Sequence, residues 1–362
     1  MTTTPALQTT SAGAPFEAAE VPLRELRDDD VLIDIAYAGI CHSDIHQARE
    51  EWGEAIFPMV PGHEIAGTVA AVGSGVTQHK VGDRVGVGCM VDSCRECEQC
   101  KNGQEQFCER GAVMTYNGTG YDGEETKGGY AQQVVVQEHF ACRIPEGIDL
   151  DVAAPLLCAG ITTYAPLKRW GAGEGTKVAV VGMGGLGHMG VKIAAAMGAD
   201  VTVLSRSLDK AEDSKALGAS QHLSTKDRDS MKGVRASFDV ILNTVSADLD
   251  MSEYLRLLKP TGALVSVGIP PSNYDFPAFG VIGGSKVVAG SQIGGIAETQ
   301  EMLDFCAEHG IGATIETLDA SDPATIDAAY DRVVDGDVRY RCVIDVSTIQ
   351  GGGQGDGGSA GA

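Results

Sequence analysis

Four cysteines lie close together in the stretch CRECEQCKNGQEQFC, residues 94–108. They are Cys94, Cys97, Cys100 and Cys108, spaced Cys-x2-Cys-x2-Cys-x7-Cys. Four thiolates fill the tetrahedral shell of a zinc ion, and the resulting charge of about −2 makes such a centre a poor Lewis acid. The loop over 92–109 has few apolar side chains, so metal binding must supply its folding energy. We therefore predict a structural zinc in this loop.

A second set of metal-binding side chains is scattered along the chain. Cys41 lies in GICHSDIHQ, His63 lies in VPGHEIAGTV, and the third candidate is Cys158 in PLLCAGITTY. Two thiolates and one imidazole make a neutral zinc site with one open coordination position, as catalytic zinc sites have. Each residue alone would more often be packed in a core, so the prediction depends on the three together.

A glycine motif points to a dinucleotide. In VVGMGGLGHMG, Gly182, Gly184 and Gly187 satisfy G-x-G-x-x-G, and the motif follows a strand-like run and opens a helix-like one. Such a turn, which here includes Gly185 and Leu186, lets a pyrophosphate approach the positive N-terminus of the helix. The alternative is a glycine-rich turn with no ligand.

The residues after the next predicted strand, VTVL, indicate which dinucleotide. An NAD site usually carries an acidic residue there, whereas this chain has Ser205, Arg206 and Ser207, with Lys210 a turn later. Two hydroxyls and two cations suit a 2′-phosphate, so we predict NADP(H). The alternative is that Arg206 is a solvated surface charge and both cofactors are used.

Apolar patterning predicts the elements that position these groups. Up to about residue 150 the apolar segments are short and bounded by glycines, which is typical of a turn-rich, mainly antiparallel β domain. From Lys177, β-branched runs alternate with helical patterns, which indicates a doubly wound parallel sheet.

The C-terminal pattern indicates that one domain is inserted in the other. Two helical patterns, 298–310 and 323–336, and a terminal strand, VRYRCVIDV, cannot form an independent core. We therefore expect an α/β protein: a mainly β domain over 1–157 and 295–347, with a dinucleotide-binding domain over 158–294 inserted in it. The first fourteen residues read as an irregular start and 348–362 as a disordered, glycine-rich tail.

Composition excludes several classes of function. The 362 residues are 43% hydrophobic, enough for two cores, and the formal charge is −23, which opposes approach to nucleic acid or anionic lipid. The start of the chain has no signal-peptide pattern, and no apolar run approaches the length of a membrane span. Ten cysteines in such a chain read as ligands and buried thiols, so we expect a cytoplasmic protein without nucleic-acid or membrane partners.

The motifs together carry a resemblance to a known family. The stretch PGHEIAGTVAAVGSGVTQHKVGDRV, the Cys41 and His63 pair, the four-cysteine lobe, the glycine motif and Cys158 occur in the order seen in zinc-dependent medium-chain alcohol dehydrogenases. The phrases PLLCAGITTY, VVGMGGLGHMG, FDVILNTV and GSQIGGIAETQEMLDFCAEHGI most resemble the NADP-dependent cinnamyl alcohol dehydrogenase branch and its bacterial aldehyde reductases. The resemblance spans about residues 25–346.

The resemblance implies a GroES-like catalytic domain, an inserted Rossmann domain and two zinc ions per subunit, one catalytic and one structural. It also implies hydride transfer between NADPH and aromatic or medium aliphatic aldehydes. The β edge at KVVAGS (286–291) pairs across a twofold axis in relatives, so a homodimer is expected and a tetramer is the alternative.

The resemblance also implies roles for residues around the catalytic zinc. Asp44 matches the acid that orients His63, and Glu64 matches a carboxylate behind the zinc. Ser43 matches the hydroxyl that hydrogen-bonds the substrate oxygen, and His46 matches the outer end of a proton relay.

Two further residues are implied at the cofactor, and five at the substrate. His42 stands where the family often has a cation near the pyrophosphate, and Arg341 resembles an arginine that contacts cofactor phosphate. The segments that line the substrate pocket in relatives contain Trp52, Phe57, Met90, Tyr116 and Ile293. Each of these five is equally compatible with ordinary core packing.

Four other functions are compatible with parts of this sequence. A nucleic-acid-binding zinc module needs a basic surface, yet residues 92–109 carry five acidic side chains against Arg95 and Lys101. A zinc-free quinone reductase or a structural protein would be expected to lack some ligands, and none is missing. Polyol or other secondary alcohol oxidation within the same superfamily is the main alternative.

Overall fold

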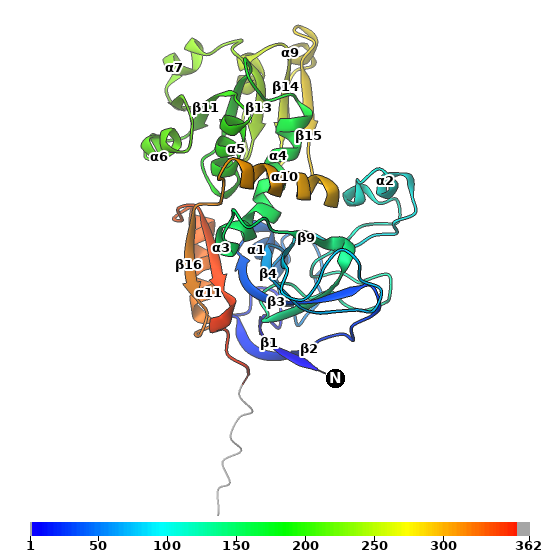
Figure 1. Ribbon diagram of the computed structural model, residues 1–362. Helices are drawn as coiled ribbons and strands as arrows, with labels where there is room; N and C mark the ends of the chain where they lie inside the picture. The colour runs from blue at the N-terminus through cyan, green and yellow to red at the C-terminus, as the bar shows by residue number, and fades with distance from the viewer. Residues whose placement is uncertain (1, 353–362) are drawn as a thin grey trace, which may run out of the picture.

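Two β-sheets, each with its own hydrophobic core, organise the chain (Figure 1). The structure is a computed structural model that describes residues 2–352. In Figure 1 the sheet built from the middle of the chain lies at the top and the sheet built from both ends lies below, with helix α10 between them.

The upper sheet is parallel throughout, in the order β12-β11-β10-β13-β14-β15. Its strands are β10 (Lys177–Val181), β11 (Asp200–Ser205), β12 (Gln221–Ser224), β13 (Phe238–Asn243), β14 (Leu258–Ser266) and β15 (Val287–Gly290). The strand order reverses beside β10, which places the predicted glycine motif at the switch point where such sheets bind ligands.

Helices cover both faces of this sheet because its β-branched strands are apolar on both sides. Val178 and Val180 pack toward α4 and α5, whereas Ala179 and Val181 belong to the cluster around α8. The helices are α4 (Ala159–Arg169), α5 (Gly185–Ala196), α6 (Ala211–Ala216), α7 (Arg228–Gly233), α8 (Met251–Leu257) and α9 (Ala278–Ile282). The doubly wound domain predicted from the sequence is thus confirmed.

The lower sheet has the order β16-β17-β3-β4-β5-β9, with β8 also paired to β3. Its strands are β3 (Asp30–Gly39), β4 (Ile65–Val72), β5 (Arg84–Val87), β8 (Gln133–Gln137), β9 (Ala141–Arg143), β16 (Ile315–Asp319) and β17 (Arg341–Asp345). Strand β17 runs antiparallel to β3, so the end of the chain returns to the N-terminal sheet as expected. The β16 strand was not foreseen because IETLD shows no continuous apolar run.

Shorter elements complete this lower part. They are β6 (Met90–Asp92), β7 (Val113–Met114), α1 (His42–Ala48), α2 (Glu98–Lys101), α3 (Leu150–Ala153), α10 (Ile296–Glu308) and α11 (Ala324–Asp335), with four 3-10 turns at Glu105–Phe107, Glu138–Phe140, Ala154–Leu157 and Val346–Thr348. Helix α10 packs against α4 of the upper part and β9 of the lower part. The exact domain boundaries at 157 and 294 therefore stay a prediction.

Two sequence expectations about the chain ends are wrong. The irregular start is a hairpin of β1 (Thr3–Gln8) and β2 (Glu17–Pro22), anchored where Leu7 N–H donates to the carbonyl of Tyr130. The predicted disordered tail begins too early, because Ile349 is buried and its carbonyl accepts a hydrogen bond from Gln132. The rest of that tail prediction, from 353 onward, lies outside the described residues.

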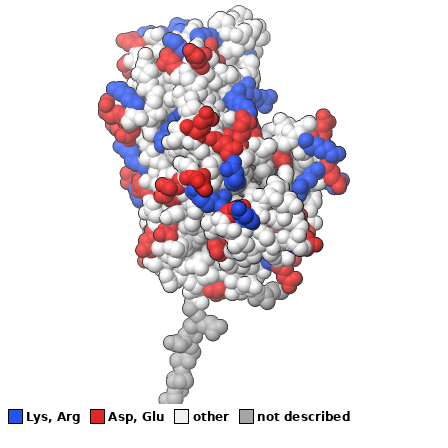
Figure 2. Space-filling model, viewed as in Figure 1, with Lys and Arg blue, Asp and Glu red and all other residues white. Residues whose placement is uncertain are grey.

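Charged side chains of both signs are exposed on the surface of the folded chain (Figure 2). Figure 2 shows acidic and basic side chains interspersed over one face, including the lobe that projects around α2, with no continuous basic patch there. Among residues 2–352, no single helix is long and apolar enough to cross a membrane. One bent pair of helical segments, Leu150–Leu157 with Ala159–Arg169, has the length and composition of a membrane span. Its apolar side chains are packed in the core.

Candidate active site

Three separate segments bring the predicted catalytic ligands together. Cys41 caps the N-terminus of α1, Cys158 caps that of α4, and His63 lies just before β4. The Sγ atoms of Cys41 and Cys158 are 3.9 Å apart, and His63 Nε2 is 3.3 Å from Cys158 Sγ. All three side chains are buried, and their donor atoms form one cluster together with a carboxylate oxygen of Glu64.

The donor set fits zinc. With Zn–S bonds of about 2.3 Å, two ligands of a tetrahedral site lie about 3.8 Å apart. The 3.9 Å separation of the two sulfurs matches this value. Two sulfurs and one imidazole nitrogen therefore lie close enough to bind one zinc ion, with the fourth position left for Glu64 or another ligand.

A buried carboxylate orients His63. Asp44 is fully buried and its Oδ1 accepts a hydrogen bond from His63 Nδ1 at 2.9 Å. The same carboxylate accepts from the backbone N–H of Cys41 at 2.9 Å and of Gly62 at 3.1 Å. When the ring is neutral with its proton on Nδ1, as it must be to bind a metal, Nε2 has a lone pair on the side of the cysteines.

The close contacts within the cluster shift the pKa values of its side chains. A hydrogen bond from Cys158 is the main cause that lowers the pKa of Cys41, and the same contact raises the pKa of Cys158. Burial lowers the pKa of His63, but the charge of Asp44 outweighs it and holds that pKa well above its usual range. The direction of the shift favours the thiolate form of Cys41, the form in which a cysteine binds metal.

Sequence reasoning missed one residue of this cluster. Cys89 is buried and packs with Cys41, Cys158 and Ile293. A hydrogen bond to Cys158 lowers its pKa. It lies in a strand-like run beside Met90, and no spacing pattern marks it in the sequence.

Glu64 and Arg341 form a buried ion pair behind the cluster. Arg341 begins β17, and a Cβ placed on Gly185 would come within 2.7 Å of the Arg341 guanidinium. Arg341 therefore touches both the metal cluster and the start of α5. A role at the cofactor phosphate stays a prediction, and its observed partner is Glu64.

The predicted proton-relay residues lie on α1. The hydroxyl of Ser43 is 3.8 Å from the sulfur of Cys41, close to the metal cluster. His46, one turn later, is partly exposed and paired with Glu51. No direct hydrogen bond joins Ser43 to His46 among the described residues, so a relay between them needs a bridging group. His42 is exposed, and its ring centre lies 6.2 Å from that of His46.

The glycine motif forms the turn between β10 and α5. Gly182 has a φ of 93°, which only glycine adopts readily, and a Cβ on Gly187 would overlap the carbonyl oxygen of Gly182. A Cβ on Gly184 would meet no atom within 4 Å. Gly182 and Gly187 are thus required by the fold, whereas Gly184 lines open space in front of the N-terminus of α5.

The predicted 2′-phosphate residues lie at the carboxyl end of β11, next to this turn. Arg206 and Ser207 are exposed and Ser205 is half-buried. The ammonium of Lys210 donates to the carbonyl of Met183, in the glycine turn, at 3.3 Å. Four hydroxyl or cationic side chains therefore lie at the end of β11 and in the segment that follows it, and their contact with the adenosine ribose and its phosphate stays a prediction.

The four cysteines of the α2 lobe also converge. Cys94 and Cys100 have their sulfurs 3.9 Å apart, and all four sulfurs lie within one cluster. Burial raises the pKa of Cys108, but hydrogen bonds from the backbone N–H of Cys94 and Arg110 outweigh it and lower that pKa to about 6. This arrangement fits a closed tetrahedral zinc site.

The lobe is attached to α10 by a buried carboxylate. Glu105 accepts a hydrogen bond from the backbone N–H of Ile296, the first residue of α10, at 3.1 Å. Its other oxygen lies 2.9 Å from His139 Nε2. Ile293, three residues before the helix, packs against Cys41 and Cys158, so the lobe is connected to the candidate metal cluster.

The five predicted substrate-pocket residues lie at different depths. Ile293 lies against the cysteine cluster, Met90 lines a small cavity beside it, and Tyr116 stacks on His63 with ring centres 5.9 Å apart. Trp52 is 44% exposed and stacks on His46 at 4.7 Å. Phe57 packs against the lower core. Their contact with a substrate stays a prediction.

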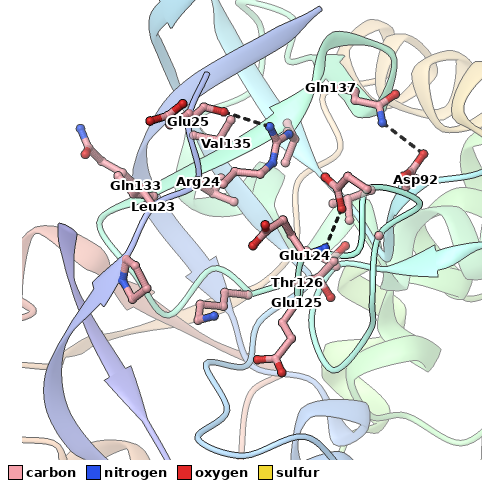
Figure 3. Close-up of a pocket in the computed structure, with 18 of the residues that line it drawn as sticks. Leu23, Arg24, Glu25, Asp92, Glu124, Glu125, Thr126, Gln133, Val135 and Gln137 are labelled. Carbon is pink, nitrogen blue, oxygen red and sulfur yellow. Dashed lines mark hydrogen bonds between the residues drawn. The ribbon is translucent and has the colours of Figure 1, made fainter. Parts of the chain in front are cut away.

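A larger cavity of about 750 Å³ lies elsewhere, between β2, β8 and the loop 120–128 (Figure 3). Figure 3 shows its charged lining, with Gln137 donating to Asp92 at 3.1 Å. None of the candidate ligand or cofactor residues lines it. We therefore assign the active site to the cysteine and glycine clusters and not to this cavity.

The chain matches two protein families in succession. Residues 27–146 match the alcohol dehydrogenase GroES-like domain, and residues 185–308 match the zinc-binding dehydrogenase family. It is 57% identical over 343 residues to a probable formaldehyde dehydrogenase, AdhA, of Bacillus subtilis, covering 95% of this chain and 97% of that protein. It is 56% identical over 349 residues to NADP-dependent alcohol dehydrogenase C of Mycobacterium bovis, covering 96% and 100%. The aldehyde reductase YahK of Escherichia coli is 50% identical over 342 residues, covering 94% and 97%.

Solved structures agree. A cinnamyl alcohol dehydrogenase of Sorghum bicolor superposes with a TM-score of 0.92 at 43% identity, covering 96% of this chain and 99% of that one. A cinnamyl alcohol dehydrogenase of Helicobacter pylori in complex with NADP(H) superposes with a TM-score of 0.90 at 42% identity, with the same coverage. The chain therefore belongs to the zinc-dependent medium-chain alcohol dehydrogenases, in the branch of NADP-dependent alcohol dehydrogenases, aldehyde reductases and cinnamyl alcohol dehydrogenases.

Proposed function

We propose that this protein is an NADP(H)-dependent zinc alcohol dehydrogenase that reduces aromatic or medium aliphatic aldehydes. The observation that carries the proposal is the convergence of Cys41, His63 and Cys158 on one point, with Arg341 connecting that point to the glycine turn of α5. A metal-binding group and a dinucleotide-binding turn thus face a common region. The relatives named as aldehyde reductases and NADP-dependent alcohol dehydrogenases support the same choice.

Each part of the site has a defined task. When bound, zinc supplies a Lewis acid for the carbonyl oxygen and NADPH supplies the hydride. Cys41, Cys158 and His63 hold the metal, and Asp44 keeps the free lone pair of His63 directed at it.

The alkoxide formed in aldehyde reduction requires a proton, and α1 supplies the groups to deliver it. The hydroxyl of Ser43 both donates and accepts hydrogen bonds, so it can accept a proton from the solvent side and donate one toward the substrate oxygen. His46 is partly exposed, and an imidazole ring can both donate and accept a proton, so it can exchange protons with solvent. The bridging group between them belongs to the bound cofactor or to water.

For the cofactor, we assign the pyrophosphate to the turn of Gly182, Gly184, Gly185, Leu186 and Gly187, and the 2′-phosphate to Ser205, Arg206, Ser207 and Lys210. Replacing Arg206 with Asp should shift the preference toward NADH, because a carboxylate repels the phosphate and accepts from ribose hydroxyls. An unchanged ratio of NADPH to NADH affinity would refute the role of Arg206.

We further propose two zinc ions per chain, one at the catalytic cluster and one at the four-cysteine lobe. Metal analysis of the purified protein should give two zinc ions per chain. The ten free cysteines fit a reducing compartment, so we place the enzyme in the cytoplasm.

The direct test is turnover of an aldehyde and alcohol panel with NADPH and NADP. The alternative function, oxidation of a polyol or other secondary alcohol, is separated by comparing benzaldehyde with NADPH against sorbitol with NAD. Faster turnover of sorbitol would contradict the proposal. Efficient benzaldehyde reduction supports it.

A further inference from the structure

The segment just before β17 reaches from the lower part of the molecule to a helix of the upper part. The phenol of Tyr340 donates to Asp213 Oδ2 at 2.8 Å, and Arg339 Nε lies 3.2 Å from the same oxygen. Asp213 belongs to α6, which follows the predicted 2′-phosphate residues (Figure 1). Tyr340 is only 6% exposed, so its ring is part of the contact between the two parts.

The ring of Tyr340 is held in place from the side of the glycine turn. It stacks on His188 of α5, with ring centres 5.1 Å apart and an interplanar angle of 12°. His188 Nε2 accepts from the backbone N–H of Thr314 at 3.2 Å, so the proton must be on Nδ1, which donates to the carbonyl of Gly184 at 3.3 Å. The carbonyl of Thr314 in turn accepts from the backbone N–H of Tyr340 at 3.0 Å.

This histidine does not titrate in the physiological range. Burial lowers the pKa of His188 to about 3, so the ring stays neutral at neutral pH. The hydrogen bonds of His188 therefore persist, and they fix Tyr340 relative to the glycine turn.

Lys210 is the cation that this ring faces. Its ammonium lies 5.0 Å from the centre of the Tyr340 ring, within the range of a cation–π contact. Its hydrogen bond is to the carbonyl of Met183, and no ion pair involves it within residues 2–352. The ammonium is thus held by a ring and a carbonyl, neither of which neutralises its charge, so that charge is available to an anion at the end of β11.

We propose that Tyr340 is a specificity-determining residue for the phosphorylated cofactor: its ring positions Lys210 for the 2′-phosphate of the adenosine ribose. The inference deepens the proposed NADP(H) function and rests on it. Because Tyr340 comes from the lower part and Lys210 from the upper part, recognition of the 2′-phosphate depends on contact between the two. Tyr340 acts through Lys210 and is therefore a positioning residue.

Binding of two fragments tests the proposal without activity. Adenosine 2′,5′-bisphosphate and AMP differ only in the 2′-phosphate, and their affinities for the full chain are measured by calorimetry. Tyr340→Leu should weaken binding of the bisphosphate about threefold to tenfold, the range of one cation–π contact, and leave AMP binding unchanged. Tyr340→Phe keeps the ring and should retain most of the preference.

A double-mutant cycle isolates the route through Lys210. In a Lys210→Met background, adding Tyr340→Leu should cause no further loss of bisphosphate affinity. Equal weakening of both fragments by Tyr340→Leu would overturn the inference, as would an undiminished effect in the Lys210→Met background. If the unmodified protein itself binds both fragments equally, the proposed NADP(H) preference fails, and this inference fails with it.

Discussion

The orientation of His63 depends on one buried carboxylate. Asp44 accepts hydrogen bonds from two backbone N–H groups and from His63, and it also lies 3.4 Å from the hydroxyl of Tyr130. Its buried oxygens therefore serve both the local backbone and the metal ligand. A neutral amide cannot accept on both sides in the same way.

Replacing Asp44 with Asn should weaken retention of the catalytic zinc by about 10- to 100-fold, because the imidazole loses the acceptor that sets its tautomer. Competition with a chelator measures this loss. Asp229→Asn, on the exposed surface of α7, is the matched control and should change nothing. Unchanged zinc retention in Asp44→Asn would contradict the assignment.

The sequence predicted the positions of single site residues less well than it predicted the long helices and strands. The three scattered ligands could be foreseen because two thiols and an imidazole in family-like stretches form a pattern. Cys89 could not be foreseen. It directly precedes β6, and nothing in the sequence shows that its side chain is buried. The same ambiguity affects Met90, which lines a small cavity, and Phe57, which packs in the lower core.

At the scale of elements, the turn from β10 to α5 separates two uses of glycine. Gly187 is required by packing, whereas Gly184 faces open space. Gly187→Ala should therefore destabilise the fold by about 1–3 kcal/mol, the usual cost of overpacking. Gly184→Ala should leave stability unchanged but weaken NADPH binding about tenfold, because the added methyl group occupies the space through which the phosphate approaches the backbone.

Thermal unfolding and NADPH titration of the two glycine variants separate these effects. Should Gly184→Ala unfold earlier while binding NADPH normally, the assignment of the pyrophosphate to this turn would be wrong. Gly187→Ala is the internal comparison, since its main effect is on stability.

The attachment of the zinc lobe to α10 makes a further prediction. Burial raises the pKa of Glu105, but the hydrogen bond to His139 and those from backbone N–H groups outweigh it, and the pKa is lowered. The ionised carboxylate therefore stabilises the fold at neutral pH, and this contribution disappears as the pH falls through the lowered pKa.

Glu105→Gln should cost about 1–3 kcal/mol of stability, because a buried charge-assisted hydrogen bond is lost at the start of α10. It should also raise the KM for the aldehyde, since Ile293 lies just before that helix. Glu98→Gln, exposed on the same lobe, is the control. If the KM of Glu105→Gln for the aldehyde equalled that of the unmodified enzyme, the lobe would have no effect on the substrate site.

Long elements were predicted better than short ones for a physical reason. Continuous β-branched runs such as those of β10 and β13 identify buried parallel strands by themselves. Strands β1, β2 and β16 carry polar residues, so their local pattern does not identify them. Strands β1 and β2 pair with each other and are anchored at Tyr130, far along the chain, whereas β16 pairs with β17.

For the whole molecule, the most exposed large apolar side chains among residues 2–352 lie on α9. Phe279 and Ile282 of α9 are 79% and 69% exposed, and β15 beside them is the edge of the upper sheet. A second copy of the chain would cover this surface, in line with our expectation of a homodimer.

If the chain forms the expected homodimer through this surface, replacing Phe279 and Ile282 with Asp should give a monomer, because two charges cannot be buried at an apolar interface. Light scattering during size-exclusion chromatography measures the mass. Val81→Asp, at an exposed residue of the lower part, serves as the control. A mass of the doubly substituted protein that still equals the unmodified dimer would place the interface elsewhere.

We propose that Cys41, His63 and Cys158 hold the catalytic metal, and the variant Cys41→Ala removes one of these three ligands. Aldehyde reduction with NADPH should fall about 1000-fold or more, the loss expected when a Lewis acid is removed. Zinc content should fall from two ions to one per chain, while NADPH binding, followed by fluorescence, should persist. If Cys41→Ala reduced the aldehyde at the rate of the unmodified protein while only the four-cysteine lobe held zinc, the assignment of the catalytic metal to Cys41, His63 and Cys158 would be wrong.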